Sequence, residues 1–146
     1  LLVCAATAIA VFFAAHLVES RYRLLLWLDA TALAAYGVFG AYKGLLVTGS
    51  GTVAVVMGMM TGTLGGIIRD VIAREPSVLL RQELYVAAAM AGALGFVAAD
   101  WLGLPLAVAA GAGFALAFTI RGGAIRFGWT LPAYKSRPGR DPRDLE

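Results

Sequence analysis

Five long apolar segments follow one another along this chain, joined by short polar connections, and no other feature limits its fold as strongly. A helix needs about 20 residues to cross a hydrocarbon core of about 30 Å. The continuous Ala, Leu and Val runs suit helices, whereas the strands of a membrane barrel alternate over about ten residues. The predicted spans are residues 1–17, 24–46, 53–72, 84–102 and 104–120.

The composition requires lipid as the solvent of these segments. Hydrophobic residues make up 60% of the 146 residues and charged residues only 14%, well beyond the usual mix of a water-soluble domain. A chain of this length still exposes roughly a third of the area of its unfolded form, so it cannot hide that much apolar surface from water. We therefore predict an all-α integral membrane protein with five transmembrane helices.

The first segment, 1–17, has the apolar character of a signal peptide but lacks a basic start. The polar stretch Glu19-Ser20-Arg21 follows it in place of a small-residue cleavage site, so we interpret it as a mature span. Because the chain does not begin with Met, we expect its natural start to lie upstream.

The basic residues predict the orientation. With five spans, all but one of the 12 lysines and arginines fall on one side of the membrane, and Lys43 is the exception. Positive loops stay cytoplasmic, which predicts a multi-pass protein of the plasma (inner) membrane with a cytoplasmic C-terminus. The polar tail, 133–146, is predicted to be disordered, and its basic character suits anionic lipid headgroups better than nucleic acid.

A weak internal repeat relates the first and fourth segments. LLVCAATAIAVFFAA aligns with LYVAAAMAGALGFVA, although most of the identical positions are alanine and such helices match often by chance. If the match is real, residues 24–102 form a three-span unit and 1–17 is the last helix of a preceding unit. A unit with an odd number of spans inserts inverted relative to its copy, which is the plan of many transporters.

One face of segment 24–46 carries polar groups. At 100° per residue, Asp29, Tyr36, Gly40 and Lys43 line a single stripe. An ionisable group costs at least about 2–3 kcal/mol near the membrane centre, so this stripe indicates a face that meets water or a partner. Alternatively, Lys43 extends to the outer headgroups and Asp29 stays hydrated near the inner surface.

Segment 53–72 is rich in glycine. Gly58, Gly62 and Gly66 form overlapping GxxxG patterns, which are typical of a groove for a second helix, and for Gly58 and Gly62 packing is the favoured interpretation. The pair Gly65-Gly66 instead predicts a broken helix, because each glycine costs about 1 kcal/mol relative to alanine in a helix.

Such a break would release backbone groups at membrane depth, where protein or a water-filled cavity must satisfy them. Exposed carbonyls attract a cation and exposed amides attract an anion or carboxylate. Thr61 and Thr63 could add hydroxyls beside the break. The pattern therefore predicts a solute path at this point.

The ends of the spans carry charged and aromatic residues. Arg69 and Asp70 follow the glycines within one turn and could close the inner end of a path; equally, Arg69 extends to the surface and Asp70 pairs with a nearby arginine. Trp27, Trp101 and Tyr85 are predicted to belong to the interfacial aromatic belt.

The stretches LDATALAAYGVFGAYKGLL (28–46), TGTLGGIIRDVIAREPSVLLRQELY (61–85) and IRFGWTLP (125–132) resemble the prokaryotic branch of the trimeric intracellular cation channel (TRIC) family. The same domain is also described as a glycine-transporter domain. The resemblance extends to Pro132, and the combination of GG-x-x-RDV with RxELY is its most specific part.

This resemblance implies a seven-helix bundle of two inverted three-helix units plus a final helix (3+3+1), assembled as a homotrimer with a pore in each subunit. Residues 1–17 would then be the last helix of an incomplete first unit, 24–102 the second unit, and 104–132 the final helix with its cytoplasmic end. Gly65 and Gly66 match the kink of the family's pore helix, and Lys43 matches the lysine of its fourth helix. Leu64 and Ala32 stand where the family commonly has glycine, which should stiffen the kink.

We therefore predict passive conduction of monovalent cations, mainly K⁺, past the Gly65-Gly66 break, with Lys43 and Asp29 setting the local field. A carrier of glycine or another small zwitterion is the alternative, and a purely structural membrane module stays open. An enzyme is disfavoured, because the sequence has no Ser/His pair, di-Asp pair or HExxH-like cluster. With Cys4 as the single cysteine, we expect no metal and no cofactor.

Overall fold

The computed structural model describes residues 22–73 and 82–128, together with the single residues 2, 6 and 9. In the two long ranges the chain forms the helices α2 (Tyr22–Thr48), α3 (Gly51–Ala73), α5 (Gln82–Trp101) and α6 (Leu106–Phe127). All four are long and apolar enough to cross a membrane, which confirms the last four predicted spans. The predictions for most of 1–17 and for the tail 133–146 lie outside the described residues.

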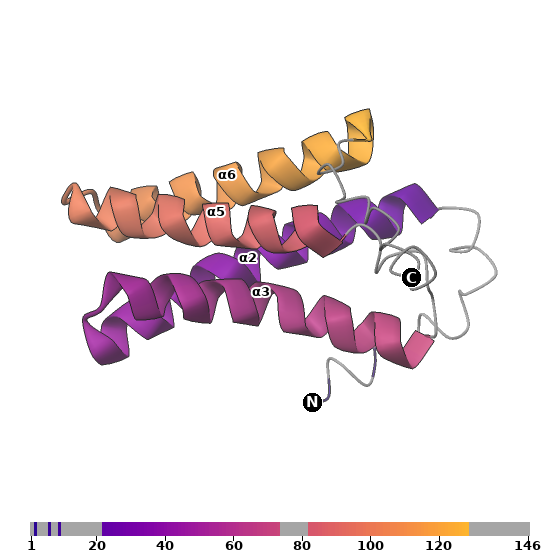
Figure 1. Ribbon diagram of the computed structural model, residues 1–146, viewed down its shortest axis with the longest axis horizontal. Helices are drawn as coiled ribbons and strands as arrows, with labels where there is room; N and C mark the ends of the chain where they lie inside the picture. The colour runs from indigo at the N-terminus through magenta and orange to yellow at the C-terminus, as the bar shows by residue number, and fades with distance from the viewer. Residues whose placement is uncertain (1, 3–5, 7–8, 10–21, 74–81, 129–146) are drawn as a thin grey trace, which may run out of the picture.

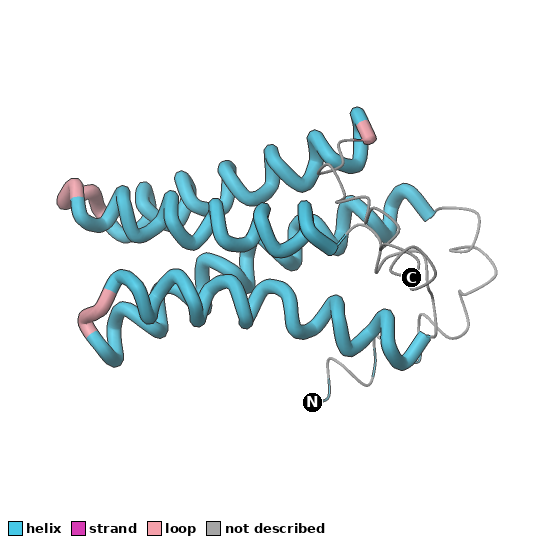
Figure 2. Tube along the Cα trace, in the orientation of Figure 1, coloured by secondary structure: helices cyan, strands magenta, loops and turns pink. Residues whose placement is uncertain are grey.

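The helices form two antiparallel hairpins, α2 with α3 and α5 with α6, which pack against each other (Figure 1). The loops of both hairpins lie at the same end of the bundle, as Figure 2 shows. Gly49 and Gly103 turn the chain there with φ of 65° and 73°, values that glycine adopts without strain. We call this end the loop end and the opposite end the Asp29 end.

Small residues allow the helices to approach closely. A Cβ added at Gly58 of α3 would come within 2.6 Å of the Gly37 carbonyl oxygen on α2 and 2.8 Å of the Ala93 methyl on α5. A Cβ at Gly92 of α5 would likewise come within 2.6 Å of the Ala117 methyl on α6. Close packing of this kind drives helix association where lipid removes the hydrophobic effect between helices.

Helix α3 differs from the sequence prediction. It is one α-helix from Gly51 to Ala73, so the prediction of an unwound break at Gly65-Gly66 is wrong, whereas a kink there stays a prediction. Two glycines cost about 1 kcal/mol each in helix propensity, whereas each backbone group left unsatisfied in lipid costs several kcal/mol. Figure 1 shows that the axis of α3 bends part-way along, which an unbroken helix can do at a glycine pair.

Helix α6 also extends beyond its predicted end at Ile120. It continues to Phe127 and is closed by Gly128, whose φ is 66° and whose N–H donates to the Ala124 carbonyl at 3.0 Å. Arg121 therefore lies within the helix and not in a surface loop. The sequence prediction ended the span at the first arginine, but this arginine finds partners inside the bundle.

Candidate functional site

Helices α2 and α3 pack in a fixed antiparallel register. A Cβ at Gly40 of α2 would come within 2.7 Å of the Thr61 Cβ on α3, and a Cβ at Gly44 would come within 3.1 Å of the Met57 Cβ. The two pairs are one helical turn apart in each helix. Each turn back along α2 therefore corresponds to one turn forward along α3.

One further turn along this register places Tyr36 of α2 level with Gly65 of α3. Lys43 lies about one turn from Gly40 in the other direction, towards the loop end. Tyr36 is 60% exposed, and Lys43, Thr61 and Gly65 are exposed as well. We call the five residues Tyr36, Gly40, Lys43, Thr61 and Gly65 the α2–α3 seam. Gly40 is buried against Thr61, and the other four residues lie on an open face of the two helices.

Gly65 differs from the other glycines in the middle of α3. A Cβ at Gly62 would come within 3.1 Å of the Leu33 carbonyl oxygen, and a Cβ at Gly58 or Gly66 would lie still closer to its neighbours. A Cβ at Gly65 would meet nothing within 4 Å. Packing among the described residues therefore explains the other three glycines but gives no reason for a glycine at position 65.

At the Asp29 end, side chains from three helices form a buried polar group, which we call the Asp29 cluster: Asp29, Tyr85 and Arg121. The Tyr85 hydroxyl donates to the Asp29 Oδ1 at 3.4 Å, and the Arg121 Nη2 lies 3.8 Å from the Asp29 Oδ2. The guanidinium carbon of Arg121 lies 4.9 Å from the centre of the Tyr85 ring, a cation–π arrangement. The Arg121 and Asp29 side chains are only 6% and 10% exposed.

The Asp29 cluster also contacts α3 through Tyr85. A Cβ at Gly66 would overlap the Tyr85 hydroxyl and would come within 2.9 Å of the ring carbon that bears it. Gly66 is thus the place on α3 where the phenol rests. The two adjacent glycines lie on different sides of the helix. Gly66 faces the bundle, and Gly65 lies on the open face.

The predicted stripe on α2 is therefore divided. Asp29 points into the bundle, while Tyr36 and Lys43 lie on the open face. The 14 helical steps from Asp29 to Lys43 correspond to about 21 Å along the helix. Asp29 and Lys43 do not meet at one point. Lys43 instead lies beside an aromatic ring of its own helix, with its Nζ 5.8 Å from the centre of Phe39.

The remaining predicted residues fall elsewhere. The Thr63 hydroxyl is buried and donates to the Met59 carbonyl of its own helix at 2.8 Å, so it does not extend the seam. Arg69 and Asp70 continue α3, and their predicted charge pairing lies outside the described side chains. Among the residues that the structure describes, no three His, Cys, Asp or Glu side chains are grouped to hold a metal ion.

The sequence prediction missed the roles of Tyr85 and Arg121. Tyr85 was assigned to the interfacial belt, but it is 6% exposed and lies inside the bundle. Trp101 is 81% exposed, as a belt residue should be, whereas Trp27 packs against Phe118 with ring centres 5.6 Å apart. The available signal was that Asp29 and Tyr85 lie near the same end of two predicted spans, and Arg121 follows the same end of a third.

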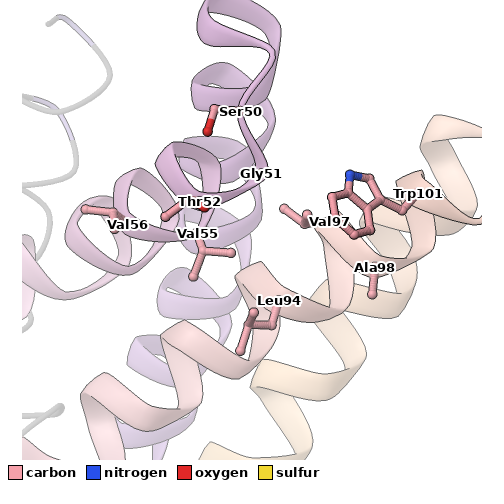
Figure 3. A pocket seen from close by; sticks show the side chains of 9 residues that line it. All are labelled: Ser50, Gly51, Thr52, Val55, Val56, Leu94, Val97, Ala98 and Trp101. Carbon is pink, nitrogen blue, oxygen red and sulfur yellow. The ribbon is translucent and has the colours of Figure 1, made fainter.

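A separate groove lies at the loop end, between the start of α3 and the end of α5 (Figure 3). Its volume is about 590 Å³ and none of the predicted path residues lines it. Apart from the Ser50 and Thr52 hydroxyls and the Trp101 indole, its walls are aliphatic. The groove and the Asp29 cluster therefore lie at opposite ends of the bundle.

Comparison with known proteins places this helical arrangement in a family. A family model described as glycine transporter matches residues 26–101. The solved structure of the TRIC trimeric intracellular cation channel orthologue from Rhodobacter sphaeroides is 45% identical in sequence, with a TM-score of 0.81, over 88% of this chain and 66% of that chain. The chain belongs to the prokaryotic TRIC family. The resemblance seen in the sequence is thereby confirmed.

Other TRIC relatives agree with this assignment. A structure solved to explain conductance through TRIC cation channels is 30% identical, with a TM-score of 0.79, over 90% of this chain and 64% of that chain. The UPF0126 membrane protein of Vibrio cholerae is 38% identical over 122 residues, and the UPF0126 inner membrane protein YadS of Escherichia coli is 37% identical over 123 residues. These matches cover 81% of this chain but only 51% and 59% of the two relatives, so the chain spans a little over half of their length.

Proposed function

We propose that the whole protein is a channel for monovalent cations, K⁺ in particular, and that the ions pass along the α2–α3 seam. The observation that carries this proposal is the open space at Gly65, where an added Cβ would meet no atom of the described residues within 4 Å. A glycine that packs against nothing is unfavourable in a helix unless something must pass or dock beside its backbone. The similarity to TRIC cation channels favours passage of a cation.

The seam supplies polar groups at intervals of one turn. Thr61 offers a hydroxyl near the middle, and Tyr36 brings a phenol level with Gly65. The neighbouring exposed side chains of α3, such as Met60 and Leu64, are apolar. A cation would therefore move between a few oxygen contacts along an otherwise apolar face, with Gly65 at the point where the backbone can approach it most closely.

A seam on the surface of four helices is only one wall of a path. We propose that helices of a first repeat unit cover it, in the inverted arrangement of many transporters, since the relatives are longer than the matched region. On this proposal residues 1–17 end the first unit, 24–102 form the second, and 104–132 add the final helix. A homotrimer with a cytoplasmic C-terminus belongs to the same proposal.

Lys43 is the charged group of the seam, because Asp29 is turned into the bundle. Its ammonium sits near the loop end and would repel a cation there by about 1 kcal/mol or more, according to how much water surrounds it. We propose that Lys43 limits the cation flux and that its neutralisation increases the flux at low ionic strength, where screening is weakest.

A carrier of glycine or a similar zwitterion is the second candidate, favoured by the description of the matching family model. The two functions separate in one experiment on the whole protein in a planar bilayer under a KCl gradient. A channel gives step-like unitary currents that reverse near the K⁺ equilibrium potential. Saturable counter-flow of labelled glycine into proteoliposomes, without unitary currents, would contradict the channel and support the carrier.

A further inference from the structure

Tyr85 contacts α3 at Gly66, which lies about 100° around the helix from Gly65 and nearly opposite the exposed Leu64 and Ile68. Gly66 is two residues from both Leu64 and Ile68, and at 100° per residue each of these points about 160° away from it. Leu64 and Ile68 are 44% and 55% exposed on the open face, whereas Gly66 rests against the Tyr85 phenol. The phenol therefore limits how closely α3 can approach the rest of the bundle at this level.

The phenol is itself held in place from two other helices. Asp29 of α2 accepts its hydroxyl hydrogen, and Arg121 of α6 lies over its ring. Tyr85 is 6% exposed, so its ring has little room to move aside. A fixed side chain on α5 thus sets the position of α3 immediately next to Gly65.

We propose that Tyr85 is a positioning residue for the ion path: held by Asp29 and Arg121, it fixes α3 at Gly66 and so sets the width of the seam at Gly65. This inference rests on the proposed channel function. It assigns the Asp29 cluster a role in conduction without any ion passing through it. Displacing α3 away from Tyr85 moves Leu64 and Ile68, the exposed neighbours of Gly65, outward, and the path beside Gly65 narrows.

The test is a double-mutant cycle on the unitary K⁺ conductance of the whole protein in planar bilayers. Gly66→Ala places a methyl against the phenol and is expected to lower the conductance by about twofold or more, because close-packed interiors transmit such a displacement. Tyr85→Leu removes the phenol and makes room for that methyl. The double variant Gly66→Ala/Tyr85→Leu is expected to recover the conductance lost in Gly66→Ala.

Unitary conductance is measured only on channels that have assembled, so a lower yield of folded protein does not affect it. Gly92→Ala is the matched control. Its methyl would be crowded against Ala117 much as the methyl of Gly66→Ala is crowded against Tyr85, but it lies between α5 and α6, away from α3. It is expected to reduce assembly while leaving the unitary conductance of assembled channels unchanged. Tyr85→Phe combined with Gly66→Ala is expected to give partial recovery, since it removes the oxygen but keeps the ring.

Two results would overturn the inference: a wild-type conductance in Gly66→Ala, or a double variant that conducts no better than Gly66→Ala alone. The proposed function fails separately, and does so if the wild type carries no unitary currents or if Gly65→Leu conducts like the wild type. A reduced conductance in Gly65→Leu together with an unaffected Gly66→Ala would leave the channel in place and remove the role of Tyr85.

Discussion

The two faces of α3 carry the same residue type for different reasons. On the bundle face, Gly58, Gly62 and Gly66 are small because a carbonyl, a methyl or a phenol occupies the space of a side chain. On the open face, a Cβ at Gly65 would meet no atom within 4 Å in the part of the chain that the structure describes. A glycine-rich membrane helix can therefore combine close packing with a passage, and the neighbours of each glycine show which of the two it serves.

The charged residues divide in the same way. The bundle face of the molecule holds an acid and an arginine that neutralise each other at 3.8 Å, whereas the seam carries Lys43 on an exposed face. A buried opposite-charge pair fixes helices, and an exposed charge beside a path acts on what moves past it. Single substitutions on each face test this division.

Replacing Arg121 by leucine should have the largest effect on stability. It leaves the carboxylate of Asp29 buried without its cation, which costs about 3 kcal/mol or more in comparable sites. We expect the free energy of unfolding, measured by SDS titration in mild detergent, to fall by that amount. The double variant Arg121→Leu/Asp29→Leu should recover most of it, and a single variant as stable as the wild type would contradict a structural Asp29 cluster.

Gly58→Ala should cause the second-largest loss of stability. Its methyl would overlap the Gly37 carbonyl at 2.6 Å and the Ala93 methyl at 2.8 Å, and overpacking of this kind costs about 1–3 kcal/mol. The same unfolding measurement reports it. If Gly58→Ala unfolded at the same SDS fraction as the wild type, the close contact between α2, α3 and α5 would not be present in the membrane.

The sequence predicted the helices well, because an apolar run of sufficient length has few other solutions in lipid. It also singled out Asp29 and the glycine pair as unusual. The helical period places Gly65 and Gly66 about 100° apart, but it cannot tell which of the two faces the bundle. That depends on which neighbours α3 meets. Arg121 was placed in a loop because the first arginine after an apolar run normally marks the membrane surface, and its partner Asp29 lies far away in sequence.

Tyr85→Phe should lower the free energy of unfolding by less than Arg121→Leu or Gly58→Ala. It removes the hydrogen bond from the Tyr85 hydroxyl to the Asp29 carboxylate, which is long at 3.4 Å. We therefore expect the free energy of unfolding to fall by about 1 kcal/mol. Tyr36→Phe is the matched control, because the Tyr36 side chain is 60% exposed on the seam. A stability loss in Tyr36→Phe equal to that in Tyr85→Phe would mean that the two faces are not as different as described.

Gly65→Ala should have the smallest effect on stability and the opposite sign. Its methyl meets open space, and alanine is favoured over glycine in a helix by up to about 1 kcal/mol. We expect a slightly higher SDS midpoint than that of the wild type. A destabilisation as large as that of Gly58→Ala would place Gly65 in a packed interface and contradict an open face.

The most direct measurement of the central claim is the unitary K⁺ conductance of Gly65→Leu in the whole protein, recorded in a planar bilayer beside the wild type. A Cβ at this position meets no described atom within 4 Å, so we expect the four described helices to fold as in the wild type. The account predicts a clearly smaller unitary current at unchanged stability. A unitary current equal to that of the wild type would contradict an ion path along the α2–α3 seam.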